Sequence, residues 1–149
     1  KVLETPGTSA NGLLTNHYYS NNSGLGITVK QISTSDYRIC CNTGTGSART
    51  YNTYGGTSNI KDKWSFLLLR FIKSTNNLTL WVNAEKEVDI TYAQYNTSQP
   101  IELFQWSVGH VTTSYKPKQK IAMASIYDIA LTDAQIDTFF QATRKRFNV

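Results

Sequence analysis

Three carboxylates alternate along residues 85–89, and pairs of carboxylates are the groups that cleave glycosidic bonds. Glu85, Glu87 and Asp89 occupy every second position, so an extended strand would place all three on one face. A retaining glycosidase holds its carboxyl groups about 5–5.5 Å apart, whereas residues two apart on a strand are separated by roughly 6.6–6.8 Å at the backbone. Catalysis would therefore need a β-bulge, and we interpret the three side chains as a solvated outer face. The residues expected to turn inward are Lys86, Val88 and Ile90.

A second set of residues could bind a sugar without cleaving it. An aromatic ring packs against the C–H face of a pyranose, and fixed amides bind its hydroxyl groups. The candidate glycan-binding residues are Tyr51, Asn52, Tyr54, Trp106, His110 and Tyr115. Asn59 is a further amide near the first of these groups. The alternative is that each tyrosine is an ordinary strand residue and that the Trp106 ring belongs to the core.

The remaining reactive residues do not form a recognisable metal or nucleophile pattern. His17 and His110 are far apart and lack a Ser or Cys partner pattern, so nucleophilic catalysis has no basis in the sequence. Cys40 and Cys41 are adjacent, which prevents an ordinary disulfide and points their side chains to opposite faces of a strand. We expect one buried thiol and one partly exposed thiol in a reducing compartment, and no zinc site.

The composition favours strands and one domain. The chain has 149 residues, of which 40% are hydrophobic, 12% aromatic and only 17% charged, a mixture that suits strands and polar turns. The longest apolar run, residues 66–69, is too short to cross a bilayer, so we expect no membrane insertion. Because the chain begins at Lys1 and not at Met, we expect it to be a piece of a longer protein.

The chain is moderately basic. Its net charge is +5 and its pI is about 9.2. The surplus bases lie outside any aromatic platform of the kind that binds single-stranded nucleic acid, so we expect no nucleic-acid partner. These bases are Lys116, Lys118, Lys120, Arg144, Lys145 and Arg146.

Alternation of apolar and polar residues predicts most of the strands. Strands are expected over 13–19, 25–29, 37–42, 49–54, 101–107 and 120–130, and a turn at 33–36 makes the second and third a hairpin. Residues 63–90 predict a three-stranded antiparallel meander with a tight turn at 83–84. Its first strand is apolar on both faces, which predicts a place in the middle of a sheet. We assign Trp64 and Trp81 to the core.

One helix is expected after residue 131. Thr132 has the side chain of an N-cap, and Gln135 three residues later completes a capping box. Ile136, Phe139 and Phe140 share one face, and a run of basic residues suits the C-terminal end of the helix.

Three stretches carry a resemblance to a known superfamily. Residues 63–71 (KWSFLLLRF), 77–83 (NLTLWVN) and 122–136 (AMASIYDIALTDAQI) resemble the concanavalin A-like lectin/glucanase superfamily, in particular its laminin-G-like jelly rolls. This sequence has Ala84 where that pattern usually has Gly. The resemblance implies an all-β fold, an antiparallel β-sandwich of the jelly-roll type with one short C-terminal helix, over a single domain 1–149.

The end of the chain narrows the resemblance. Residues 139–149 (FFQATRKRFNV) look like the close of laminin-G-like domains at the C-termini of bacteriophage and large-virus structural proteins. This implies a non-enzymatic phage virion component, on a tail fibre or the capsid, that binds a cell-surface glycan or mediates host adhesion. An extracellular location is the alternative. Calcium recurs in the superfamily, but Asp36 and Asp62 are isolated, so we expect no metal or other cofactor.

Two other functions stay open at this point. The chain could be a purely structural assembly domain that contacts other virion proteins or sister chains, for example as a homotrimer. It could also be a glycan hydrolase, because glucanase members of the superfamily carry an acidic strand that is similar to residues 85–89; kinship in fold does not by itself carry that activity.

Overall fold

The structure is a computed structural model, and it describes residues 1–4, 11–15, 25–44, 49–91, 105–106 and 118–149. The strands are β1 (Val2–Glu4), β2 (Asn11–Thr15), β3 (Leu25–Ser33), β4 (Asp36–Gly44), β5 (Arg49–Gly55), β6 (Leu67–Ile72), β7 (Asn77–Val82), β8 (Glu85–Thr91), β9 (Gln105–Trp106) and β10 (Lys118–Gln119). The helices are the 3-10 helix η1 (Lys73–Thr75) and α1 (Asp133–Phe147).

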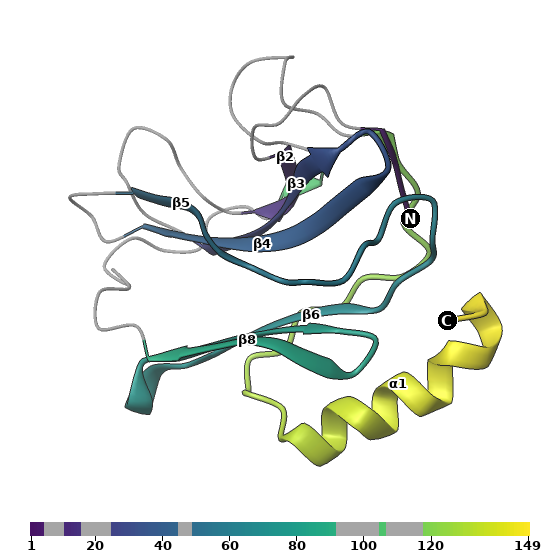
Figure 1. Cartoon of the computed structure of the whole chain (residues 1–149). Coiled ribbons are helices and arrows are strands. Elements are labelled where there is room, and N and C mark those ends of the chain that lie inside the picture. The colour runs from purple at the N-terminus through teal and green to yellow at the C-terminus, as the bar shows by residue number, and fades with distance from the viewer. Residues whose placement is uncertain (5–10, 16–24, 45–48, 92–104, 107–117) are drawn as a thin grey trace.

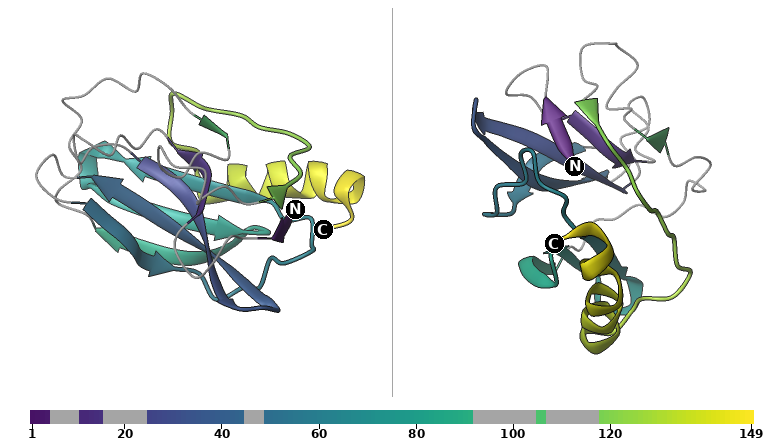
Figure 2. Two further views of the ribbon diagram at one scale, coloured as in Figure 1. Left: turned by 90° about the horizontal axis from the view of Figure 1, so that it is seen from above. Right: turned by 90° about the vertical axis from the view of Figure 1, so that its right-hand side faces the viewer.

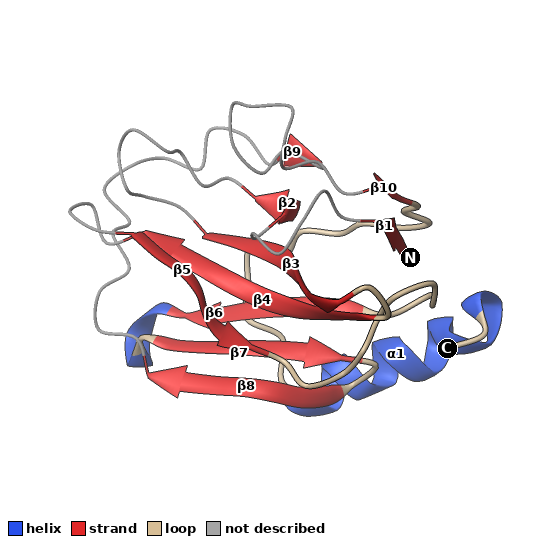
Figure 3. Cartoon of the chain, turned by 45° about the horizontal axis from the view of Figure 1, so that its top comes forward, coloured by secondary structure: helices blue, strands red, loops and turns tan. Residues whose placement is uncertain are grey.

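Two antiparallel sheets lie one above the other and share an apolar core (Figure 1). The upper sheet has the order β5-β4-β3-β2-β9 and the lower sheet has the order β6-β7-β8, while β1 pairs with β10. Val29 and Ile39 of the upper sheet are buried in one cluster with Leu80 and Val82 of the lower sheet. The expected all-β fold with one C-terminal helix is confirmed at this level (Figure 3).

The hairpin expected over residues 25–42 is confirmed as β3 and β4, which pair along their length around a turn at 34–35. The strand expected over 49–54 is confirmed as β5. Of the strand expected over 13–19, β2 covers residues 11–15, and 16–19 lie outside the described residues. Of that expected over 101–107, only residues 105–106 are described, and they form β9.

Both cysteines of β4 are buried, so the expectation of one partly exposed thiol is wrong. Cys40 is 2% exposed and Cys41 is 1% exposed. Neighbouring residues on a strand face opposite ways, so both faces of the upper sheet are covered here, as the buried Thr28 opposite Cys40 also shows. Burial raises the pKa of the Cys40 thiol, and it raises the pKa of the Cys41 thiol to about 12.

The meander is confirmed as β6-β7-β8, but the position expected for its first strand is wrong. β6 lies at the edge of the lower sheet, and β7 is the central strand. The apolar residues on the two faces of β6 have different neighbours: Leu67 and Leu69 pack against the shared core, while the next residue before the strand, Phe66, contacts the helix rings. Two covered faces therefore imitate the pattern of a central strand.

The strand expected over 120–130 is also wrong. Only the preceding residues, β10, pair as a strand, whereas residues 121–130 have no helix or strand and are exposed throughout. Figure 2 shows this segment passing along the outside of the molecule from β10 to α1. Its apolar residues fit a strand, but the segment is not paired with any described strand.

The helix begins and ends as expected. The Thr132 side chain accepts a hydrogen bond from Gln135 N, and the Gln135 side chain accepts one from Thr132 N, which together form a capping box. Ile136 and Phe140 are buried against the body of the protein. Within the described part of the chain, no helix has both the length and the apolar character that a membrane crossing requires.

The two tryptophans assigned to the core differ in burial. Trp81 on β7 is 6% exposed, which confirms its assignment. Trp64, in contrast, is only half-buried and lies beside Phe147 at the end of α1, with 6.3 Å between the ring centroids. It was expected in the core because it precedes an apolar strand, but the strand begins three residues later, at Leu67.

Candidate functional site

The acidic strand β8 contains the bulge that its chemistry would have required. The pairing of β8 with β7 shifts at Glu87, which has no partner in the register. The bulge brings Lys86 to the side of Asp89, where Lys86 Nζ lies 2.8 Å from Asp89 Oδ2. The expectation that Lys86 turns inward is therefore wrong: its Nζ lies 5.4 Å from the centroid of the Trp81 ring, and its side chain is one-third exposed.

Glu87 joins the two sheets through its carboxylate. It accepts hydrogen bonds from Thr57 N at 2.8 Å and from Ser58 N at 3.2 Å. Residues 57–58 directly follow β5 of the upper sheet, whereas Glu87 lies on β8 of the lower one. Gly56 makes this approach possible, because a Cβ atom at that position would overlap with the Glu87 carboxylate. These hydrogen bonds give the Glu87 side chain a structural role.

Asp89 is likewise held by neighbouring side chains. It accepts hydrogen bonds from Lys86 Nζ and from Asn77 Nδ2, both at 2.8 Å. These two hydrogen bonds lower the pKa of Asp89 below its usual value. A general acid in glycoside hydrolysis needs a raised pKa instead. Glu85, the third carboxylate, is exposed at the start of β8.

The sheet order separates the residues predicted to bind a sugar. Tyr51, Asn52 and Tyr54 lie on β5 and Trp106 lies on β9, which are the two opposite edges of the upper sheet. Three strands lie between these edges, so the backbones are roughly 19 Å apart. The structure describes these four residues through their backbones only, and His110 and Tyr115 lie outside the described residues.

Asn59, the further amide, makes three structural hydrogen bonds. Its Oδ1 accepts from Tyr37 N and from Lys61 N, each at 3.0 Å, and its Nδ2 donates to Ser35 O at 2.8 Å. The side chain thus ties the segment after β5 to the β3–β4 turn. Its amide is already engaged and is not offered to a sugar hydroxyl.

A charged cluster fixes α1 to the outer face of the lower sheet. Arg70 of β6 donates to Thr79 Oγ1, to Leu131 O and to Asp133 Oδ1 of α1, at 3.2, 2.8 and 2.6 Å. Its guanidinium also lies over the Trp81 ring, 5.5 Å from the centroid, and its side chain is 9% exposed. These three hydrogen bonds and the ring contact join β6, β7 and the start of α1, so the cluster is a structural anchor. The sequence carries no signal for this cluster, because β6, β7 and the start of α1 are distant along the chain.

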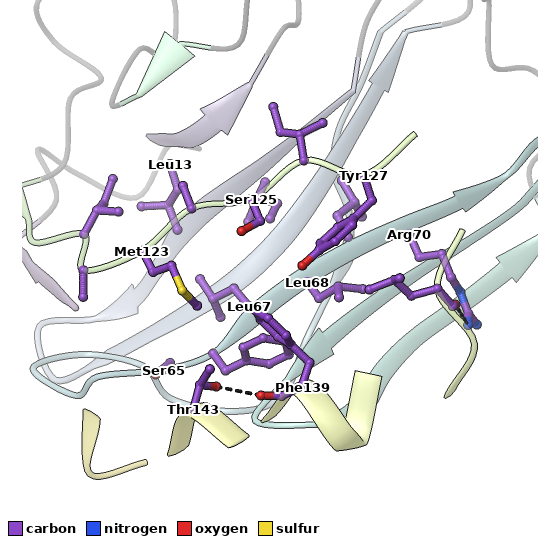
Figure 4. Close-up of a pocket in the computed structure, with 18 of the residues that line it drawn as sticks. Leu13, Ser65, Leu67, Leu68, Arg70, Met123, Ser125, Tyr127, Phe139 and Thr143 are labelled. Carbon is purple, nitrogen blue, oxygen red and sulfur yellow. Dashed lines mark hydrogen bonds between the residues drawn. The ribbon is translucent and has the colours of Figure 1, made fainter. Parts of the chain in front are cut away.

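A cleft lies between β6, α1 and residues 121–131. Its volume is about 510 Å³, within the range of small-ligand pockets. Figure 4 shows Met123 pointing toward Leu67, and Tyr127 contacts Phe139 of α1 edge to face, with 6.4 Å between ring centroids. Its lining is mainly apolar, with Ser125 and Arg70 among the few polar residues.

Three segments rich in basic residues meet at one end of the molecule. β10 pairs with β1, Asp62 N donates to Val2 O, and Trp64 contacts Phe147, so residues 61–64, 118–120 and 144–147 are neighbours. Figure 2 shows both chain termini at this end. We call the group the basic end; it consists of Lys1, Lys63, Lys118, Lys120, Arg144, Lys145 and Arg146.

The basic end carries little compensating charge. Among the described residues, the ion pairs of the protein use Arg38, Arg70 and Lys86. None of these pairs involves Lys1, Lys63, Lys120, Arg144, Lys145 or Arg146. Asp62 is an exposed acid within the same region. Five of these seven bases belong to the surplus of basic residues seen in the sequence. Their convergence in space depends on contacts between distant segments.

A metal centre is not formed by the described residues, because they contain no group of three or more His, Cys, Asp or Glu side chains that could hold an ion.

Comparisons with protein-family models, with curated proteins and with solved structures gave no match.

Proposed function

We propose that this chain is a non-enzymatic module of a virus particle surface, of the bacteriophage type, that mediates adhesion by binding an acidic carbohydrate. The proposal includes a concanavalin A-like jelly roll, which two facing antiparallel sheets and the resembling stretches support. The observation that carries the binding role is the convergence of seven bases at the basic end, all of them exposed except the half-buried Lys1.

The contacts of the carboxylates support a non-enzymatic role. Glu87 accepts hydrogen bonds from two backbone amides, and Asp89 is paired with Lys86 and bonded to Asn77. A hydrolase would need one carboxyl group free to donate a proton and a second one facing the same bond. Glu87 and Asp89 instead hold neighbouring segments together, and Glu85 is exposed at the start of β8.

Charge supports an acidic ligand over a neutral one. The bases of the basic end are exposed apart from the half-buried Lys1, and like charges gathered on one surface attract a polyanion over a distance of about 8–10 Å at physiological salt. Polysaccharides with carboxylate, sulfate or phosphate groups fit this surface. A neutral sugar would use the aromatic and amide residues predicted from the sequence.

The test is binding of heparin, as an acidic probe, and of dextran, as a neutral control, measured by calorimetry at several salt concentrations. We expect heparin to bind and dextran not to bind, with affinity falling steeply as salt rises. Replacing Arg144 and Arg146 by Glu should abolish binding, whereas Lys73→Glu, an exposed base outside the group, should not. Equal loss in both variants, equal binding of duplex DNA, or no heparin binding would overturn the proposal.

Neutral glycans need a separate experiment, because the sequence predicts their site elsewhere. Because Tyr54 and Trp106 lie on opposite edges of the upper sheet, we expect a glycan array to show no neutral-glycan signal that depends on both. A signal that falls in Trp106→Ala and in Tyr54→Ala, and persists in the variant without Arg144 and Arg146, would establish the neutral-sugar site. An array without any signal would remove the neutral-sugar site and leave the acidic one.

A structural assembly domain is the second candidate, and one observation favours it. Five large apolar residues are 45–64% exposed along one segment of the chain; they are Ile121, Met123, Ile126, Tyr127 and Ile129. Exposed apolar stretches of this kind commonly mark protein contacts.

A further inference from the structure

Residues 121–130 form an exposed segment that is rich in large apolar side chains. All ten are exposed, and Ile126 and Ile129 are 64% and 63% exposed. Such exposure is costly for large apolar side chains, roughly 25 cal/mol for each Å² left in water. The segment therefore has a driving force to be covered.

The backbone of the same segment is also open. Among the described residues, 121–130 form no backbone hydrogen bond with another part of the chain. The segment is nevertheless fixed at both ends, because Lys120 N donates to Lys1 O and Arg70 Nη1 donates to Leu131 O. A tethered stretch whose backbone groups form no hydrogen bond to the rest of the described chain is a template for strand pairing.

The sequence of the segment is complementary to itself. Only two residues among 120–130 are charged, Lys120 and Asp128. In an antiparallel pair centred on Ala124, each Lys120 lies opposite Asp128 of the other copy, and Ile121 lies opposite Tyr127. At the centre Ala124 lies opposite its own copy, and on either side Met123 lies opposite Ser125 and Ala122 opposite Ile126, so each large side chain of these pairs faces a small one.

We propose that two copies of this chain associate through residues 120–128, paired as antiparallel strands about a two-fold axis at Ala124. The contact is isologous, so the same segment is covered in both copies at once. It supplies the paired strand that the sequence of the segment predicts and that the described residues of one copy do not provide. The inference does not depend on carbohydrate binding.

Cysteine cross-linking of the full chain tests the centre of the pair. Opposed residues of antiparallel strands have Cα atoms about 4.5–5.5 Å apart, within the range that a disulfide spans. We expect Ala124→Cys to give a covalent dimer under mild oxidation. In the matched control Ala130→Cys the two thiols would lie about 40 Å apart, so no dimer should form. The native thiols are buried and should not interfere.

Charge exchange tests the register. By sedimentation, the protein should show a concentration-dependent dimer, and Lys120→Asp or Asp128→Lys should each raise its dissociation constant about three- to tenfold. The double variant, which exchanges the charges, should restore dimerisation. A monomer at all concentrations, equal cross-linking at both cysteine positions, or no recovery in the double variant would overturn the proposal.

Discussion

The tight turn between β7 and β8 holds an alanine in a left-handed conformation, and this predicts a stabilising substitution. Val82 pairs with Glu85, so Asn83 and Ala84 form a two-residue loop with φ angles of 53° and 65°. Both angles lie in the left-handed region, as in a type I′ turn, whose favoured sequence is Asn-Gly. Asn83 suits its position, whereas Ala84 is strained by its Cβ atom.

We expect Ala84→Gly to stabilise the protein. A left-handed conformation costs an alanine about 1–2 kcal/mol, and glycine gives back roughly 0.4–1 kcal/mol through the greater freedom of the unfolded chain. The net gain is about 0.5–1 kcal/mol. For a chain of this size, each kcal/mol raises Tm by about 2–4 °C. Urea denaturation would show a higher midpoint with an unchanged slope.

The same substitution in α1 provides a matched control. Ala142 is exposed inside the helix, where glycine costs about 1 kcal/mol relative to alanine. Ala142→Gly should therefore lower the urea midpoint while Ala84→Gly raises it. If both variants lost stability to the same extent, the left-handed turn could not be the feature that limits this position.

Three further results are expected. Gly56→Ala should destabilise the fold by about 1–3 kcal/mol in urea, because the new Cβ overlaps with the Glu87 carboxylate; unchanged stability would contradict the contact. Asp89 has a lowered pKa, so its contribution is present above the unfolded value and lost as pH falls below about 4; Asp89→Asn should flatten the fall of Tm between pH 5 and 3. Cys40 and Cys41 should react with thiol reagents slowly at pH 7 and rapidly in urea; fast native labelling would refute their burial.

Local signals predicted the local structure well. The capping box of Thr132 and Gln135 depends on residues three apart, and the turn at Asn83 depends on two neighbours, so both are confirmed in detail. Contacts between distant segments carried no such signal. The apolar faces of β6 are covered by a second sheet and by a helix, which a one-dimensional pattern cannot distinguish from strands on either side.

The candidate site was predictable only in part. The residue types of the basic end were visible in the sequence, but its convergence depends on the pairing of β1 with β10 and on the contact of Trp64 with Phe147. For the acidic strand β8, the sequence predicted a regular alternation that the structure does not show. Its spacing suggested a shared face, whereas the bulge at Glu87 gives neighbouring acids different partners.

The bulge and the carboxylate at Glu87 have a consequence for solubility. β8 is an edge strand with a bulge, and its Glu87 side chain accepts a hydrogen bond from Thr57 N. An edge strand of this kind pairs poorly with a strand of another molecule. These two features disfavour the addition of a further strand on the β8 side. Replacing this one acid, as in Glu87→Ala, should make the protein more prone to precipitate.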